Sequence, residues 1–162
     1  MKTCIFIVGD RNSGKTSTVR SLTGCNSSRL WIVKNLKGRP IKAFVLQKAI
    51  TEFGGKKHPP NKFPASFEQK FDVNRRDYEI LICPFELRTY RKYSLDKYIQ
   101  NARNQRFNVK VVIIKKDYQG TPYIISNIQN ICLMLGIRPL ILDITNDYVE
   151  EARRIRRRFY PR

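Results

Sequence analysis

The sequence has few acidic residues and almost no histidine. Its 162 residues include 13 Asp and Glu against 32 Lys and Arg, and one histidine, His58. A histidine-based metal centre needs clustered ligands, and we expect the lysine- and proline-flanked His58 to be solvated. The four cysteines, at positions 4, 25, 83 and 132, form no C-x-x-C pair, and three lie in apolar segments. We therefore expect buried free thiols in a reducing, cytoplasmic environment.

Long hydrophobic runs are also missing. No apolar stretch approaches the length that crosses a bilayer, so we expect no membrane partner. The hydrophobic content of 41% is ordinary for a globular chain. A length of 162 residues is enough to bury a core without disulfides or metals, and we expect a single domain over residues 1–162.

The shortage of acidic residues leaves a formal net charge of +19. Such an excess repels itself in a compact chain and is best tolerated beside a polyanion. DNA or RNA is the natural candidate, and another polyanion, such as an acidic protein partner, is the alternative.

One eight-residue segment has a phosphate-binding pattern. Residues 9–16 read Gly-Asp-Arg-Asn-Ser-Gly-Lys-Thr, which fills every fixed position of G-x-x-x-x-G-K-[ST]. The apolar, β-branched run Cys4–Val8 precedes it and predicts a strand, while residues 17–22 can form a helix. Strand, glycine loop and helix are the context that this motif requires. Residues 4–22 therefore resemble the P-loop NTPase superfamily (the Walker A motif), without indicating a family within it.

The resemblance implies a role for each residue of the loop. Gly9 lets the chain leave the strand in a conformation that a side chain would hinder. Backbone amides up to Thr16 would hold the β-phosphate at the positive end of the following helix. Lys15 would reach the β- and γ-phosphates and take part in catalysis, and the hydroxyl of Thr16 would bind Mg²⁺. The predicted nucleotide-binding residues of this segment are Gly9, Asn12, Ser13, Gly14, Lys15, Thr16 and Ser17.

Strand-like and helix-like segments alternate along the chain. The apolar runs are continuous, which is typical of strands buried on both faces, so we expect an α/β fold. It should contain a mostly parallel sheet of about six strands with helices on both faces. A turn at residues 37–40 predicts an antiparallel hairpin over 29–47. We also expect Pro84 to end the strand at 78–83, and residues 54–64 to form a long loop.

A hydrolysing P-loop enzyme usually carries a second acidic residue, after a strand beside the P-loop strand. Asp143 follows an apolar strand but comes late in the chain, and it is better explained as a residue that ends a strand. Glu86 comes three residues after the predicted end of a central strand and could still reach back, so it is a candidate catalytic residue. Gln47 stands where a GTPase would have aspartate.

The order of the elements resembles that of Ras-like GTPases, but the motifs that read guanine are incomplete. Asp-x-x-Gly is absent, and Asn-Lys-x-Asp survives only as Lys115 and Asp117 without its asparagine. Asp117 remains a candidate for contact with the base. Because no base-specific motif is intact, we expect Mg²⁺ with ATP, and GTP is possible.

Two clusters of basic residues follow predicted elements. Arg88 and Arg91 lie among tyrosines just after a strand, and Arg88 is a candidate for stabilising charge near the γ-phosphate. The last predicted helix begins near Asp147 and has an apolar face that includes Val149, with acidic residues at its start and arginines at its end, as the helix dipole favours. Arginine also suits phosphate contacts. The predicted nucleic-acid-binding residues are Arg153, Arg154, Arg157 and Arg158.

The sequence thus indicates a nucleoside triphosphate-binding and hydrolysing protein that acts on or near nucleic acid. A slow or non-hydrolysing nucleotide switch is one alternative, favoured by the lack of a clear second acid. A kinase for a small acceptor, with residues 54–64 as a lid, is another. The sequence does not indicate an oligomeric state.

Overall fold

The computed structural model describes residues 1–9, 14–53, 57–86, 94–115, 121–143 and 147–161. The strands are β1 (Lys2–Gly9), β2 (Arg29–Lys34), β3 (Pro40–Val45), β4 (Ile80–Glu86), β5 (Phe107–Lys115) and β6 (Leu140–Asp143). The α-helices are α1 (Lys15–Thr23), α2 (Ala65–Lys70), α3 (Leu95–Asn104), α4 (Thr121–Met134) and α5 (Tyr148–Phe159).

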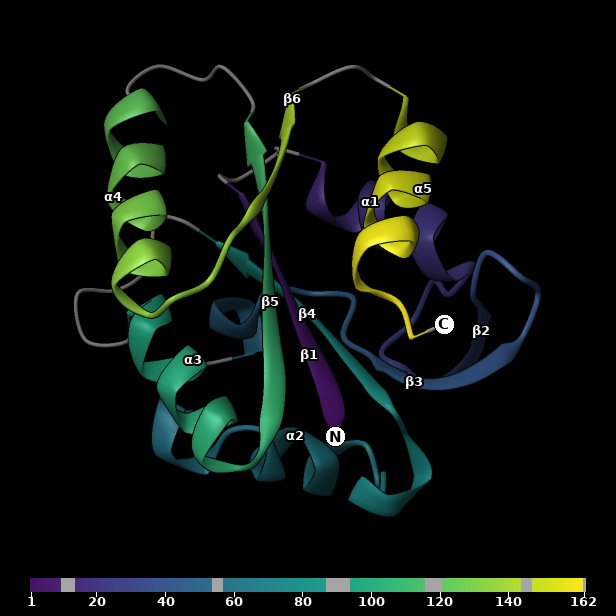
Figure 1. Ribbon diagram of the computed structural model, residues 1–162. Coiled ribbons are helices and arrows are strands. Elements are labelled where there is room, and N and C mark those ends of the chain that lie inside the picture. The colour runs from purple at the N-terminus through teal and green to yellow at the C-terminus, as the bar shows by residue number, and fades with distance from the viewer. Residues whose placement is uncertain (10–13, 54–56, 87–93, 116–120, 144–146, 162) are drawn as a thin grey trace.

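All six strands belong to one sheet in the order β2-β3-β4-β1-β5-β6 (Figure 1). Only the β2–β3 pair is antiparallel, and the pairs β3–β4, β4–β1, β1–β5 and β5–β6 are parallel. The expected α/β fold with a hairpin at 29–47 is therefore confirmed. The first strand lies in the interior of the sheet, between β4 and β5.

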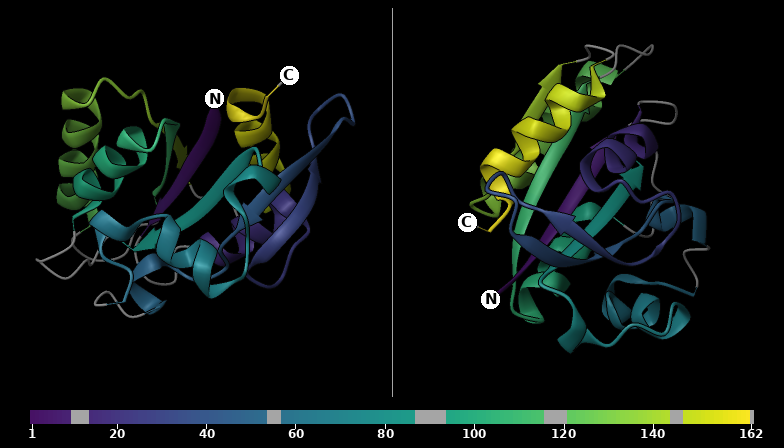
Figure 2. Two further views of the ribbon diagram at one scale, coloured as in Figure 1. Left: turned by 90° about the horizontal axis from the view of Figure 1, so that it is seen from below. Right: turned by 90° about the vertical axis from the view of Figure 1, so that its right-hand side faces the viewer.

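Helices cover both faces of the sheet (Figure 2). Alternate residues of β1 point to opposite faces, so Cys4, Phe6 and Val8 join one core and Ile5 and Ile7 join the other. The first core includes buried side chains of α2, α3 and α4, and the second includes those of α1 and α5. Burial on both faces explains why the strand sequences are continuous apolar runs. All four cysteines are free and buried, as expected.

The structure corrects the expectation that Pro84 ends its strand. Strand β4 continues through Pro84 to Glu86, in parallel register with β1 as far as Gly9. The carbonyl of Ile82 accepts a hydrogen bond from the amide of Leu46, so the backbone N–H and C=O of Ile82 point toward β3. The backbone of Pro84, two residues later, points to the same side, but β3 has already ended there, at Val45. A missing N–H therefore costs no ladder hydrogen bond there.

Of the loop predicted at 54–64, residues 54–56 lie outside the described residues, and residues 57–64 are mostly irregular but packed against α3. A 3₁₀ turn covers Pro60–Lys62. The Tyr98 hydroxyl of α3 donates to the His58 carbonyl at 2.7 Å, and the Asn101 amide donates to the Phe63 carbonyl at 2.6 Å. His58 itself is buried rather than solvated, because its ring stacks on Phe67 with the centroids 4.1 Å apart. Burial, reinforced by nearby lysines, lowers the pKa of His58.

Among the described helices none has the length and apolar content needed to cross a membrane.

Candidate functional site

The Gly9–Thr16 segment, which the sequence predicts to bind phosphate, spans the end of β1 and the start of α1. Gly9 is the last residue of β1 and Lys15 is the first residue of α1, while residues 10–13 lie outside the described part. The strand that leads into the motif has β4 on one side and β5 on the other, both parallel to it. In open α/β sheets, ligands bind beyond the carboxyl ends of such interior strands.

Gly14 occupies a position that only glycine fits. It is the N-cap of α1, with φ of +90°, a conformation that side chains rarely adopt. A Cβ atom at Gly14 would also lie 2.9 Å from Cε1 of Tyr148 and 3.1 Å from its hydroxyl oxygen. The Tyr148 ring, from the first residue of α5, therefore lies directly against the glycine. No motif in the sequence identified Tyr148 as a neighbour of this segment.

Lys15 is buried at the start of α1, and its Nζ donates to the carbonyl oxygen of Gly9 at 3.0 Å. This bond holds the ammonium group at the carboxyl end of β1, across the segment that separates the strand from the helix. Thr16 is exposed in the first turn of α1, and Ser17 beside it is half-buried. Lys15, next to Thr16 in the first turn of α1, thus lies at the end of β1 marked by Gly9.

Glu86 ends the strand next to the motif. It is paired in parallel register with Gly9 and is half-buried. Because β4 continues past Pro84, Glu86 is the final residue of the strand and is not three residues beyond it, as the sequence suggested. A carboxylate is therefore present at the sheet edge where β1 meets α1.

The other residues considered for this acidic role lie farther from the motif. Asp143 ends β6, which pairs with β5 and is separated from β1 by that strand. Gln47 follows β3, which is separated from β1 by β4. The Gln47 side-chain amide donates to the carbonyl of Cys25, and its backbone amide donates to the Ser28 hydroxyl at 2.8 Å, so Gln47 holds the segment after α1.

Helix α5 contacts α1 near both ends of α1. Near the start of α1, the Thr18 hydroxyl donates to Oε2 of Glu151 at 3.3 Å, and both residues are buried. Near its end, the Arg156 guanidinium donates to the carbonyls of Ser21 and Leu22, each at 2.8 Å, and so caps the last turn of α1. Burial raises the pKa of Glu151, and the hydrogen bond from Thr18 offsets part of this effect.

We expect Glu151→Gln to raise the thermal midpoint. A group whose folded pKa is raised loses stabilising free energy as the pH rises from its unfolded pKa through its folded pKa. At neutral pH the carboxylate is therefore a cost that the amide avoids, while the amide oxygen still accepts from Thr18. Each kcal/mol gained corresponds to about 2–4 °C in a chain of this size. Calorimetric melts at pH 4.5 and 7.5 should show the rise in thermal midpoint mainly at the higher pH. An equal rise at both pH values would contradict the claim that the charge on Glu151 lowers stability.

The apolar face of α5 differs in one position from the sequence interpretation. Ala152, Ile155 and Phe159 are buried as expected, but Val149 is 69% exposed and Glu151 is buried in its place. The sequence pattern treated Glu151 only as an acidic residue that opens the helix. Asp147 does cap the helix, because its side chain accepts from the Glu150 amide at 3.1 Å.

The predicted nucleic-acid-binding arginines of α5 are all exposed. Arg153 forms an exposed ion pair with Glu150 at 3.8 Å, which is worth little in solvent. Arg156, in the same run, is half-buried and caps α1. Arg157 and Arg158 line two different surface pockets, so the four predicted residues do not converge on one point.

Several predicted site residues lie outside the described residues. These are Asn12, Ser13, Arg88 and Asp117. Within the described part of the chain, no group of three or more His, Cys, Asp or Glu side chains is placed to hold a metal ion.

No family model matches this chain, and no curated protein matches it.

Proposed function

We propose that this chain is a P-loop protein that binds a nucleoside triphosphate with Mg²⁺ and hydrolyses it. The observation that carries the proposal is the position of the Gly9–Thr16 motif. It leads from the carboxyl end of an interior parallel strand into a helix, with Glu86 in register beside it. The α5 contacts that fix α1 keep the helix start in place for a ligand.

The residues present suit the phosphates. A glycine with positive φ lets the backbone approach closely, and the first turn of α1 offers amide groups that favour anions. Lys15, already turned toward the Gly9 carbonyl, supplies positive charge at the strand end. The roles proposed for Asn12, Ser13 and Ser17 are contacts to phosphate oxygens, and Arg88 would neutralise charge that develops on the γ-phosphate.

The residues present also suit Mg²⁺, which prefers oxygen ligands and keeps several waters. Thr16 offers an exposed hydroxyl, and Glu86 offers a carboxylate that can hold a bound water or orient the attacking one. Bound Mg²⁺ would supply Lewis-acid stabilisation of the phosphate charge. Glu86 would accept the proton of the attacking water or position it. We propose ATP as the nucleotide, with GTP as the alternative that Lys115 and Asp117 would support.

Thr16→Ala tests the metal role. We expect the variant to lose about tenfold in affinity for ATP with Mg²⁺ and to bind metal-free ATP as the wild type does, because only the hydroxyl is removed. Because Thr16 is exposed, we expect the variant to fold as the wild type does, and circular dichroism checks this. Thr16→Ser restores the hydroxyl and should restore affinity. An equal loss with and without Mg²⁺ would contradict the assignment.

A second proposed contact is with nucleic acid. It rests on the net charge of +19 and on the exposed arginines of α5, Arg153, Arg154, Arg157 and Arg158. Nonspecific binding of this kind is dominated by release of counterions from the phosphate backbone. The kinase alternative needs a movable segment over the site, and the packing of residues 57–64 against α3 does not favour that role for them.

A further inference from the structure

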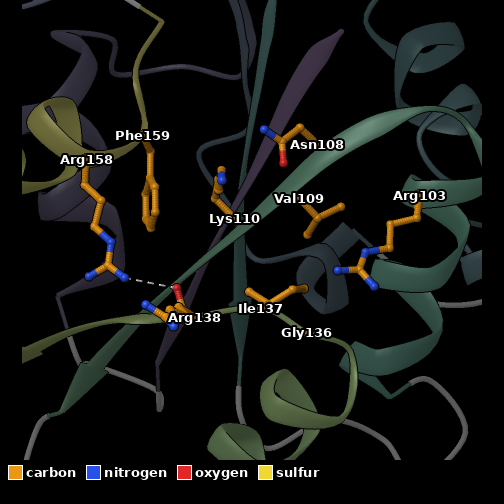
Figure 3. Close-up of a pocket in the computed structure, with 9 residues that line it drawn as sticks. All are labelled: Arg103, Asn108, Val109, Lys110, Gly136, Ile137, Arg138, Arg158 and Phe159. Atoms are coloured by element: carbon orange, nitrogen blue, oxygen red, sulfur yellow. Dashed lines mark hydrogen bonds between the residues drawn. The ribbon is translucent and has the colours of Figure 1, made fainter.

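A basic pocket lies near the start of β5, at the end of the sheet opposite to the Gly9–Thr16 motif. It has a volume of about 390 Å³ and is open to solvent. It is formed by the start of β5, the end of α3, the connection between α4 and β6 and the end of α5 (Figure 3). Strands β1 and β5 are parallel, so the amino end of β5 and the carboxyl end of β1 lie at opposite ends of the strands. The lining residues are Arg103, Asn108, Val109, Lys110, Gly136, Ile137, Arg138, Arg158 and Phe159.

Of the described residues that line the pocket, four are cations and none is acidic. Figure 3 shows Arg103, Lys110, Arg138 and Arg158 arranged around the pocket, each from a different element or connection. None of the four forms an ion pair within the described part of the chain. Their one hydrogen bond with each other runs from the Arg158 guanidinium to the backbone carbonyl of Arg138, at 3.4 Å. Folding therefore brings positive charges together without neutralising them.

Helix dipoles explain part of this arrangement but not all of it. Helices α3 and α5 end at this edge, and α4 ends just before Gly136, which has a φ of +69°. Each helix end carries about half a negative charge, so three of them offset about 1.5 of the four positive charges. The Gly136 and Ile137 amides already bond to carbonyls of the last turn of α4. A clear positive excess remains in the pocket, which suits an anionic ligand.

The exposure of the side chains distinguishes a polymer from a single small anion. Arg103, Arg138 and Arg158 are exposed and Lys110 is half-buried, so solvent weakens each contact with an isolated ion. A polymer gains from several such contacts at once, because each releases a counterion. Among the described lining residues the one aromatic side chain is Phe159, which is only 7% exposed. Single strands use accessible aromatic rings to stack bases, so this surface fits the backbone of a duplex better.

We infer that Arg103, Lys110, Arg138 and Arg158 bind phosphates of a double-stranded nucleic acid, at a site separate from the nucleotide site. This inference rests on the proposed contact with nucleic acid and names where it occurs. Of the arginines of α5 predicted from the sequence, it assigns a central role to Arg158, and to Arg154 one turn before it on the same side of the helix. Arg153 and Arg157, which do not line this pocket, contribute less.

The test compares two variants that each lose four positive charges. The first changes Arg103, Arg138, Arg158 and Lys110 to Gln. The second, a matched control, changes Lys34, Lys37, Arg39 and Lys42 to Gln; all four are exposed on the β2–β3 hairpin. Fluorescence anisotropy with a labelled 20-base-pair DNA duplex, at 50 to 200 mM salt, gives the slope of log affinity against log salt. Each lost phosphate contact flattens the slope by about 0.9.

We expect the pocket variant to flatten the slope by about 3 and to bind at least tenfold more weakly at 100 mM salt. The hairpin variant should change the slope by less than 1. Equal changes of slope and affinity in the two variants would overturn the inference, because duplex binding would then depend on the total charge and not on this pocket. Unchanged duplex binding by the pocket variant, with lost binding of inorganic phosphate or tripolyphosphate, would also overturn it in favour of a small anion.

A control keeps this test separate from the nucleotide proposal. The pocket variant should bind ATP with Mg²⁺ as the wild type does, and its melting temperature checks its fold. If the wild-type chain binds no duplex at 50 mM salt, the proposed nucleic-acid contact fails together with the pocket. If it binds duplex and the pocket variant binds equally well, the pocket alone is wrong.

Discussion

Replacing Lys15 by alanine should weaken the binding of ATP with Mg²⁺ by about a hundredfold, which is about 2.8 kcal/mol. The ammonium group is held at the end of β1 by its bond to the Gly9 carbonyl, beside the start of α1. Charge-assisted hydrogen bonds to phosphate are among the stronger polar contacts in proteins. The loss should be larger for ATP than for AMP, which lacks the β- and γ-phosphates.

The stability of the Lys15→Ala variant must be measured beside its affinity. Lys15 is buried, so the variant leaves the Gly9 carbonyl without this donor and should cost about 1 kcal/mol of unfolding free energy. Lys34→Ala is the matched control, because Lys34 is exposed on β2 and lies away from the motif. Equal ATP affinity in the wild type and in Lys15→Ala would contradict the proposed role of the lysine.

Replacing Glu86 by glutamine should reduce hydrolysis by about 10²–10³-fold and change ATP affinity by less than threefold. The amide keeps the size of the side chain but can neither accept a proton nor carry charge for the water or the metal. Glu86 is the carboxylate in register with Gly9, on the strand beside β1. Release of inorganic phosphate under saturating ATP measures the effect.

Glu79→Gln is the matched control for Glu86. Glu79 is exposed just before the first residue of β4. The substitution therefore removes the same charge as Glu86→Gln, but at the opposite end of the same strand. Asp143→Asn, at the end of β6, should also leave hydrolysis unchanged, because β5 separates that strand from β1. If Asp143→Asn abolishes hydrolysis and Glu86→Gln does not, the acidic residue is misassigned. If the wild-type chain binds ATP without measurable turnover, the slow-switch alternative replaces the hydrolase.

The elements of the fold could be predicted because they follow from local patterns. The continuous apolar runs identified the buried strands, and the turn at 37–40 identified the hairpin. A capping residue identified the start of a helix, as with Asp147 at the start of α5. These signals act over a few residues, so they do not depend on how distant parts of the chain meet.

What the sequence could not supply depends on contacts between distant segments. Whether Pro84 ends a strand depends on where β3 stops, which local rules do not show. The sequence named Glu86 as a candidate, but its register beside Gly9 depends on the pairing of β4 with β1. Tyr148 and Glu151 lie more than 130 residues from Gly14 and Thr18, and no motif links them. The lysines and prolines beside His58 suggested a solvated ring, and local rules do not show that Phe67 of the following helix α2 stacks on it.

The central claim, that the Gly9–Thr16 segment binds a nucleoside triphosphate, is tested most directly by calorimetric titration of the wild-type chain with ATP and Mg²⁺. We expect saturable binding of one ATP per chain, weaker for ADP and much weaker for AMP, since the proposed contacts are to the β- and γ-phosphates. No saturable binding of ATP or GTP up to millimolar concentration, by a chain that melts cooperatively, would contradict it.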